Sequence, residues 1–383
     1  MSDFQLPLMK GFSRRQMMRA ASIITAGASM PFYNEFALAQ QAQGGGARAM
    51  RGAMPADAVR ISSNENPLGP CPEAVEAICK VAKFGGRYSP FGEQGDFIKA
   101  VCDMEGVKPD YVAAYAGSSD PLHRAVCAYT SPTKSLVMGD PGYESGAGTA
   151  KFIGAKVHRV PLTKDYAHDV KAMLKADPNA GVYYICNPNN PTGTITKRED
   201  IEWLLANKNK DSILLLDEAY IHFSQEMPGA DLVAKDKDVI VLRTFSKAYG
   251  MAGIRAGTAL GRPDLLAKMR PYGSGMLPIT GLVAATASLR VKSLIAERRD
   301  INKRIRENTL EFLDKKNIKY IPSESNKFMM EAGRPGPELT KALAAEKVFI
   351  GRTWPIYPTM VRVTIGTQEE MDKFKAALSK VMA

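Results

Sequence analysis

Seven short apolar runs, separated by amphipathic segments, constrain the fold of this chain more than any other feature of its sequence. They cover residues 111–116, 135–139, 156–162, 181–186, 213–216, 239–243 and 257–260. Nearly continuous apolar strands that alternate with helices are typical of a mostly parallel sheet covered on both faces. In such a sheet the ligand lies at the carboxyl ends of the strands. The sequence therefore predicts an α/β domain with its site at that edge.

The pattern changes after Pro278, where charged and shorter elements replace the alternation. We expect a long helix over residues 288–315, strands near 327–331 and 361–365, and a last helix from Gln368. A chain of 383 residues with 45% hydrophobic content is long enough for two domains. The sequence therefore predicts a large domain over 85–277 and a smaller α+β domain over 278–383.

The first 39 residues have the order of an export signal. Arg14 and Arg15 precede a weakly apolar stretch over residues 20–32, and Ala37-Leu38-Ala39 offers a small-residue cleavage site. This order resembles a twin-arginine signal peptide, and it implies the twin-arginine export machinery as a partner and a periplasmic location. The alternative is a flexible basic arm on a cytoplasmic protein. The apolar stretch is too short and too polar to span a bilayer, so we expect no stable membrane insertion.

Charge and composition narrow the kinds of ligand. The formal net charge is +11, but no run of basic residues carries interleaved aromatic side chains. This favours anionic small molecules over nucleic acid as partners. The five cysteines show no CxxC spacing and the four histidines form no HExxH pair, so neither a disulfide framework nor a metal site is indicated. Gly, Ala and Gln dominate residues 40–51, and we expect a flexible connector over 40–58.

Four polar motifs follow predicted strands at the edge where a ligand should lie. Asn190, Asp217 and Lys247 each come shortly after an apolar run, and Ser118 and Ser119 lie between a predicted strand and a predicted helix. Each motif has an ordinary interpretation as a turn, a helix cap or a surface lysine. Each also has a chemical one, because a lysine in an apolar setting can attack a carbonyl and a helix N-terminus can bind phosphate.

The order of these motifs is more specific than any one of them. With Arg255 eight residues after the lysine, Arg362 near the end of the chain and Asn-Glu-Asn-Pro-Leu-Gly-Pro over 64–70, they resemble the fold type I aminotransferases, specifically the histidinol-phosphate aminotransferase family. The resemblance runs from about residue 59 to the end. It implies an α/β protein of the pyridoxal 5′-phosphate (PLP)-dependent transferase fold type I, in which residues 59–84 lie at the active site. It also implies PLP as the cofactor.

The resemblance assigns roles around this cofactor. Lys247 would hold PLP as a Schiff base and carry a proton between the substrate and cofactor carbons. Asp217 would pair with the ring nitrogen, Asn190 and Tyr220 would bind the ring hydroxyl oxygen, and Tyr143 would stack on the ring. The phosphate would be held by Ser118, Ser119, Thr244, Ser246 and Arg255.

Other family positions concern the substrate and a second subunit. Tyr88 would reach the phosphate of a neighbouring subunit, which implies a homodimer with shared sites. Arg362 would bind the α-carboxylate, Arg352 a distal phosphate, and Asn66 would also contact substrate. The segment 353–358, Thr-Trp-Pro-Ile-Tyr-Pro, departs from the family pattern and leaves the natural donor open. It either shapes a substrate pocket or packs between the domains.

These observations predict a class I/II aminotransferase that moves an amino group between an amino donor and a 2-oxo acid acceptor. A PLP-dependent decarboxylase or lyase is the alternative, because it uses the same constellation and cleaves a different bond. Arg362 favours transamination, since it orients a carboxylate. A PLP-binding module without turnover is a remote alternative, because it has no need for Lys247, Asp217 and Arg255 together.

Overall fold

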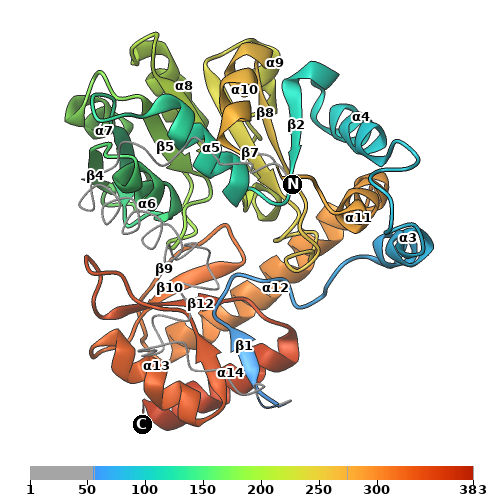
Figure 1. The fold of residues 1–383 in the computed structure, drawn as a ribbon. Coiled ribbons are helices and arrows are strands. Elements are labelled where there is room, and N and C mark those ends of the chain that lie inside the picture. The colour runs from blue at the N-terminus through green and yellow to red at the C-terminus, as the bar shows by residue number, and fades with distance from the viewer. Residues whose placement is uncertain (1–54, 56, 274, 383) are drawn as a thin grey trace, which may run out of the picture.

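The computed structural model of the protein describes residues 55, 57–273 and 275–382. The predicted signal peptide and most of the predicted connector lie outside the described residues. The described chain forms two domains, each with its own sheet. In Figure 1 the smaller domain contains the first strand of the described chain, in blue, and the C-terminal elements, in red. Within the described residues no single helix has the length and apolarity to cross a membrane, although one pair of helices, bent by 85°, passes the same test.

The large domain is built on a seven-stranded sheet. Its strand order is β2-β8-β7-β6-β5-β3-β4. The strands β3 to β7 pair in parallel, whereas β8 runs antiparallel to both β7 and β2. Each of the seven predicted apolar runs forms one strand, and the bounds are β2 (Val112–Tyr115), β3 (Leu136–Asp140), β4 (Val157–Pro161), β5 (Val182–Cys186), β6 (Ile213–Asp217), β7 (Val239–Thr244) and β8 (Gly257–Gly261).

Both faces of this sheet are apolar because successive side chains of a strand point to opposite sides. On β6, Leu214 and Leu216 pack into one core cluster, while Ile213 and Leu215 pack into the other. The first face is covered by α3 (Pro72–Ala82), α4 (Glu93–Glu105), α7 (Val170–Ala176), α8 (Arg198–Asn207), α9 (Ala230–Ala234) and α11 (Ile279–Arg290). The second is covered by α5 (Ser119–Tyr129), α6 (Ser145–Phe152) and α10 (Pro263–Met269).

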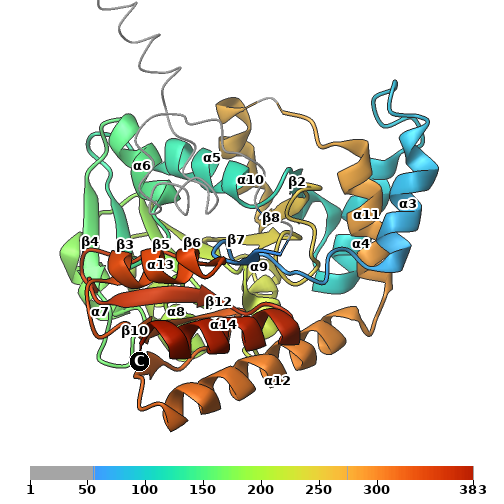
Figure 2. The same ribbon diagram turned by 90° about the horizontal axis from the view of Figure 1, so that it is seen from below.

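The small domain packs helices against an antiparallel sheet (Figure 2). Its strand order is β12-β10-β9, and a separate parallel pair joins β1 to β11. The bounds are β1 (Val59–Ile61), β9 (Tyr320–Ile321), β10 (Lys327–Glu331), β11 (Val348–Ile350), β12 (Met360–Thr364), α12 (Leu294–Lys315), α13 (Gly336–Ala345) and α14 (Gln368–Val381). Because β1 belongs here and α3 covers the large sheet, the segment between them passes from one domain to the other.

One element lies on the other side of the predicted domain boundary. The sequence pattern predicts that everything after residue 277 belongs to the small domain, with one helix over 288–315. The structure instead has two helices, and Leu282, Ala284 and Ala285 of α11 are buried in the core of the large domain. Pro278 thus marks the start of a helix rather than of a domain, and the chain returns to the small domain along α12.

Candidate functional site

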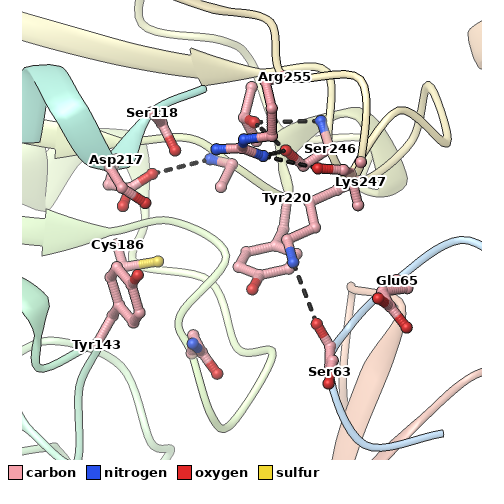
Figure 3. A pocket seen from close by; sticks show the side chains of 16 residues that line it. Ser63, Glu65, Ser118, Tyr143, Cys186, Asp217, Tyr220, Ser246, Lys247 and Arg255 are labelled. Carbon is pink, nitrogen blue, oxygen red and sulfur yellow. Dashed lines mark hydrogen bonds between the residues drawn. The ribbon is translucent and has the colours of Figure 1, made fainter. Parts of the chain in front are cut away.

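A cavity of about 320 Å³ lies at the carboxyl ends of the large-domain strands (Figure 3). The loops that follow β2, β3, β5, β6 and β7 all open at this edge, and β8 begins there because it runs in the opposite direction. Ten of the residues predicted for the site line the cavity: Ser118, Ser119, Tyr143, Asn190, Asp217, Tyr220, Thr244, Ser246, Lys247 and Arg255. The topology therefore gathers side chains that are up to 137 positions apart in sequence, from Ser118 to Arg255.

Asp217 is a carboxylate at the inner end of β6. Its side chain accepts hydrogen bonds from the Tyr184 hydroxyl at 2.9 Å and from the backbone N–H of Ala219 at 3.1 Å. Burial raises the pKa of Asp217 to about 6, although these hydrogen bonds and the charges of Lys247 and Lys327 act in the opposite direction. A buried acid of this kind is suited to pair with a protonated ring nitrogen, which would favour its ionised form.

Tyr184 is a site residue that the sequence analysis missed. It lies within the apolar strand β5, two residues before Cys186, which is paired in register with Asp217. Because residues two apart in a strand share a face, Tyr184 points to the same side as Cys186. No local motif distinguishes this tyrosine from a core residue, and only the register reveals its proximity to Asp217.

Lys247 follows β7 and extends its amine into the cavity. Its Nζ donates to the carbonyl oxygen of Ser63 at 3.3 Å and lies 5.6 Å from the centre of the Tyr220 ring. Figure 3 shows this amine beside the tyrosine ring and joined to Ser63. Ser63 and Glu65 line the cavity from the segment that was predicted to lie at the active site. The lysine is therefore placed where a carbonyl in the cavity can be attacked.

The opposite end of the cavity is built for an anion. Ser118 and Ser119 lie at the N-terminus of α5, and Ser246 accepts from Arg255 Nη1 at 3.0 Å. Arg255 Nη2 also donates to the carbonyl oxygen of Ala116 at 2.8 Å. A side chain at Gly117 would overlap this guanidinium, so the glycine leaves room for it. Helix N–H groups, hydroxyls and a fixed guanidinium together suit a phosphate.

Two further polar side chains, those of Tyr220 and Asn190, line the cavity. Tyr220 is buried, and its hydroxyl accepts from Asn64 Nδ2 at 2.9 Å. A phenolic hydroxyl is also a donor group. Arg362 Nη1 donates to Asn190 Oδ1 at 3.0 Å, and the amide nitrogen of an asparagine is a donor group. Both side chains line the cavity and carry the donor groups that the expected contact with a ring oxygen requires.

Four predicted residues lie outside the lining of the cavity. Arg362 is buried directly behind Asn190. Arg352 forms an ion pair with Glu144 and stacks on Trp354, with its guanidinium 4.1 Å from the ring centre. Asn66 donates to the carbonyl oxygen of Ala248 at 3.0 Å, and so holds the turn that carries the lysine. The fourth, Tyr88, is 88% exposed on a loop between α3 and α4.

The residues present fit PLP when they are tested against its groups. The buried Asp217 carboxylate can meet the ring nitrogen, the Lys247 amine can meet the aldehyde, and the cradle around Arg255 can hold the phosphate. In the part of the chain that the structure describes, no three His, Cys, Asp or Glu side chains gather as a metal site. The lysine, the buried carboxylate and the anion cradle together suit amine and acid–base chemistry with an organic cofactor.

Comparisons with known proteins agree with this geometry. The sequence profile of the family "Aminotransferase class I and II" matches residues 56–378. A histidinol-phosphate aminotransferase from Moorella thermoacetica is 31% identical over 338 residues, which is 85% of this chain and 86% of that protein. An aromatic amino acid aminotransferase from Cutibacterium acnes is 32% identical over 85% of this chain and 93% of its own length.

A solved structure gives the same relationship in three dimensions. The histidinol-phosphate aminotransferase from Sinorhizobium meliloti, in complex with PLP, superposes with a TM-score of 0.80 at 26% identity. The match covers 98% of this chain and 99% of that one. The profile and the relatives each span most of the chain, and the cavity contains the groups that the chemistry of the family needs. The chain therefore belongs to the class I and II aminotransferases, a family whose cofactor is PLP.

Proposed function

We propose that this aminotransferase moves an amino group from an amino acid or related amine to a 2-oxo acid at the Lys247 cavity, as a homodimer that works in the periplasm. One observation carries the activity. Lys247 lies in one cavity with a buried carboxylate, Asp217, and an anion cradle around Arg255. Bound PLP supplies a carbonyl for amine exchange and a ring that accepts electrons from the substrate carbon.

The residues of the chain then have distinct tasks in the reaction. With PLP bound, Asp217 would keep positive charge on the ring nitrogen, and Asn190 and Tyr220 would hold the ring oxygen; all three line the cavity. Lys247 would take the proton from the α-carbon of the donor and return it at the cofactor carbon. Arg362 binds and orients the α-carboxylate as a planar fork, which places the bond to the α-hydrogen for cleavage and favours transamination over loss of CO₂.

The surroundings of Arg352 support a donor without a distal phosphate. Glu144 already pairs with this guanidinium, so a phosphate would have to displace an internal carboxylate. The neighbouring side chains are aromatic, with Trp354 beneath Arg352 and Tyr357 in an edge contact with Tyr166, 6.0 Å between ring centres. We therefore propose an amino acid with an aromatic or other uncharged side chain as the donor, rather than histidinol phosphate.

Exposed aromatic side chains support the homodimer with shared sites. Tyr88 and Phe91 are 88% and 63% exposed on one loop, and Phe91 makes an edge contact with Phe84 at 4.8 Å. Apolar rings on a free surface cost free energy that a second subunit would recover. A neighbouring chain seated here would receive Tyr88 at its own phosphate cradle.

The order of residues 13–39 supports export. A paired arginine, a weakly apolar stretch and a small-residue site follow one another as in a twin-arginine signal. An exported enzyme would meet the donors outside the cytoplasm, and we propose that histidinol phosphate is not among them. Location and donor are thus two parts of one proposal.

A panel of amino donors tests the activity and its specificity together. The purified enzyme is offered aromatic, aliphatic and acidic amino acids and histidinol phosphate, with 2-oxoglutarate or pyruvate as acceptor, and both the new amino acid and CO₂ are measured. We expect amino-acid formation without CO₂ and a preference for an uncharged donor. Release of CO₂ in step with donor consumption would establish the decarboxylase instead, and a wide preference for histidinol phosphate would refute the proposed donor.

A further inference from the structure

A second lysine, Lys327, is buried beside the cofactor cavity. It is the first residue of β10, and its side chain is completely inaccessible to solvent. Its Nζ lies 3.1 Å from the centre of the Tyr220 ring and donates to Ser325 Oγ at 2.8 Å. Removing an ammonium from water costs several kcal/mol unless partners compensate for it. The groups that surround Lys327 must therefore compensate for the burial of its ammonium.

Tyr220 is the main aromatic partner of this ammonium. The tyrosine follows β6 of the large domain, whereas Lys327 belongs to the small domain, so the contact joins the two. An ammonium over an aromatic face is attracted by the electron density of the ring, and the attraction grows when both groups are desolvated. Here the tyrosine is 3% exposed and the lysine 0%. The contact therefore belongs to the strong, buried class.

The backbone around Lys327 is fixed by the segment that also binds the tyrosine hydroxyl. Lys327 pairs with Thr364 in the register of β10 and β12. Thr364 Oγ1 donates to Asn64 Oδ1 at 3.1 Å and accepts from the backbone N–H of Asn64 at 3.0 Å. Asn64 in turn donates from Nδ2 to the hydroxyl of Tyr220. The small domain thus holds this tyrosine at two points, its ring face through Lys327 and its oxygen through Asn64.

We propose that Lys327 is a positioning residue that sets the place and the donor strength of the Tyr220 hydroxyl toward the oxygen of the cofactor ring. The ammonium holds the ring face and withdraws electron density from it. The phenolic O–H becomes a stronger donor as a result, and it points from a ring that cannot tilt. Lys327 is not part of the cavity lining, and its contact with the cavity is through the Tyr220 ring. Its charge also lowers the pKa of Asp217, an effect that the Tyr220→Phe background leaves in place. The inference rests on the proposed function in one respect, the binding of PLP in this cavity.

A double-mutant cycle isolates this pathway. Lys327→Met keeps the length of the side chain and removes its charge, Lys327→Arg keeps the charge, and Tyr220→Phe keeps the ring and removes the hydroxyl. Two quantities are measured for each variant and for Lys327→Met/Tyr220→Phe, namely the Kd of the apoprotein for PLP and the visible absorbance maximum of the holoenzyme. The matched control is Lys319→Met, because Lys319 is an exposed lysine of the same domain.

We expect Lys327→Met to weaken PLP binding by about tenfold and to shift the absorbance maximum, in keeping with a buried cation–π contact. Lys327→Arg should keep most of the PLP affinity and an absorbance maximum close to that of the wild type. Lys319→Met should change neither the affinity nor the absorbance maximum. In the Tyr220→Phe background the effect of Lys327→Met should largely disappear, because the hydroxyl through which it acts is gone.

Two outcomes separate failure of the inference from failure of the proposed function. If wild-type apoprotein binds no PLP, the proposed function fails. If it binds PLP but Lys327→Met has the same effect with and without the tyrosine hydroxyl, or none at all, Lys327 does not act through Tyr220. Should Lys327→Met fail to fold by its thermal unfolding curve, Lys327→Gln, which also removes the charge, replaces it in both backgrounds and decides in the same way.

Discussion

Arg362 and Asn190 meet across the boundary between the two domains, with 3.0 Å between Nη1 and Oδ1. The arginine comes from β12 of the small domain and the asparagine from the loop after β5 of the large one. The other terminal nitrogen of Arg362, Nη2, donates to the carbonyl oxygen of Ser62 at 2.6 Å. The guanidinium proposed to bind the substrate carboxylate is therefore fixed in place by contacts with both segments.

Replacing this arginine by lysine should impair substrate binding more than cofactor binding. Lys cannot present two parallel donors, so Arg362→Lys should raise KM for the amino acid and lower kcat/KM by on the order of tenfold to a hundredfold. Steady-state kinetics with the best donor measure both values, and PLP retention is followed by absorbance. The matched variant is Arg352→Lys, which should change kcat/KM for an uncharged donor little. Equal losses in the two variants would remove the distinction between the arginines.

Asp217 should matter for turnover rather than for retention of the cofactor. In Asp217→Asn the ring nitrogen loses its anionic partner, so charge that develops on the ring is no longer stabilised. We expect kcat to fall on the order of 10²-fold or more, with PLP still bound. Single-turnover rates test the expected fall in turnover, and the PLP content of the purified variant tests whether the cofactor is retained. Near-normal turnover would remove Asp217 from its assigned role.

The raised pKa of Asp217 also predicts how the stability of the ligand-free protein depends on pH. Its pKa is about 6, against 3.8 for an unperturbed aspartate. The folded state therefore binds this proton more tightly than the unfolded state, so the stabilisation is complete below about pH 4 and is lost as pH rises to about 6. It amounts to on the order of 3 kcal/mol. Urea unfolding of wild type and Asp217→Asn between pH 4 and 7 should differ by this change, whereas parallel curves would show an ordinary pKa.

Export should depend on guanidinium groups and not merely on charge. Changing Arg14 and Arg15 to Lys preserves the charge but removes the feature that the export receptor reads. The variant should stay in the cytoplasm with residues 1–39 attached, while the wild type is found outside the inner membrane, cut after Ala39. Fractionation and N-terminal sequencing distinguish these products. Uncleaved wild type in the cytoplasm would leave residues 1–39 as a basic arm.

The strands and the cavity lining could be predicted because each carries a local signal. Buried strands are apolar along their length, and the residues after them are polar. The sheet edge at which Asp217 and Lys247 lie can therefore be recognised from the sequence. The helix α11 had no such signal. Its side chains are buried like those of a strand, and only its packing on α3 and α4 assigns it to the large domain.

Long-range contacts account for the rest of what the sequence analysis missed. Tyr184 reaches Asp217 through strand register, and Lys327 reaches Tyr220 from another domain. In the sequence alone, nothing distinguishes a tyrosine in an apolar run or a lysine at the start of a strand from any other residue of its type. The pairing of Arg352 with Glu144 is equally invisible, since 208 positions separate them.

Identifying the lysine that carries the cofactor tests the central claim most directly. The purified protein is saturated with PLP, reduced with borohydride, digested and analysed by mass spectrometry, in parallel with Lys247→Ala and Lys327→Met. We predict a yellow wild-type protein with one phosphopyridoxyl group on Lys247, the same label in Lys327→Met, and neither colour nor label in Lys247→Ala. Label on Lys327 or on no lysine, or a protein that stays colourless with added PLP, would contradict the assignment of Lys247.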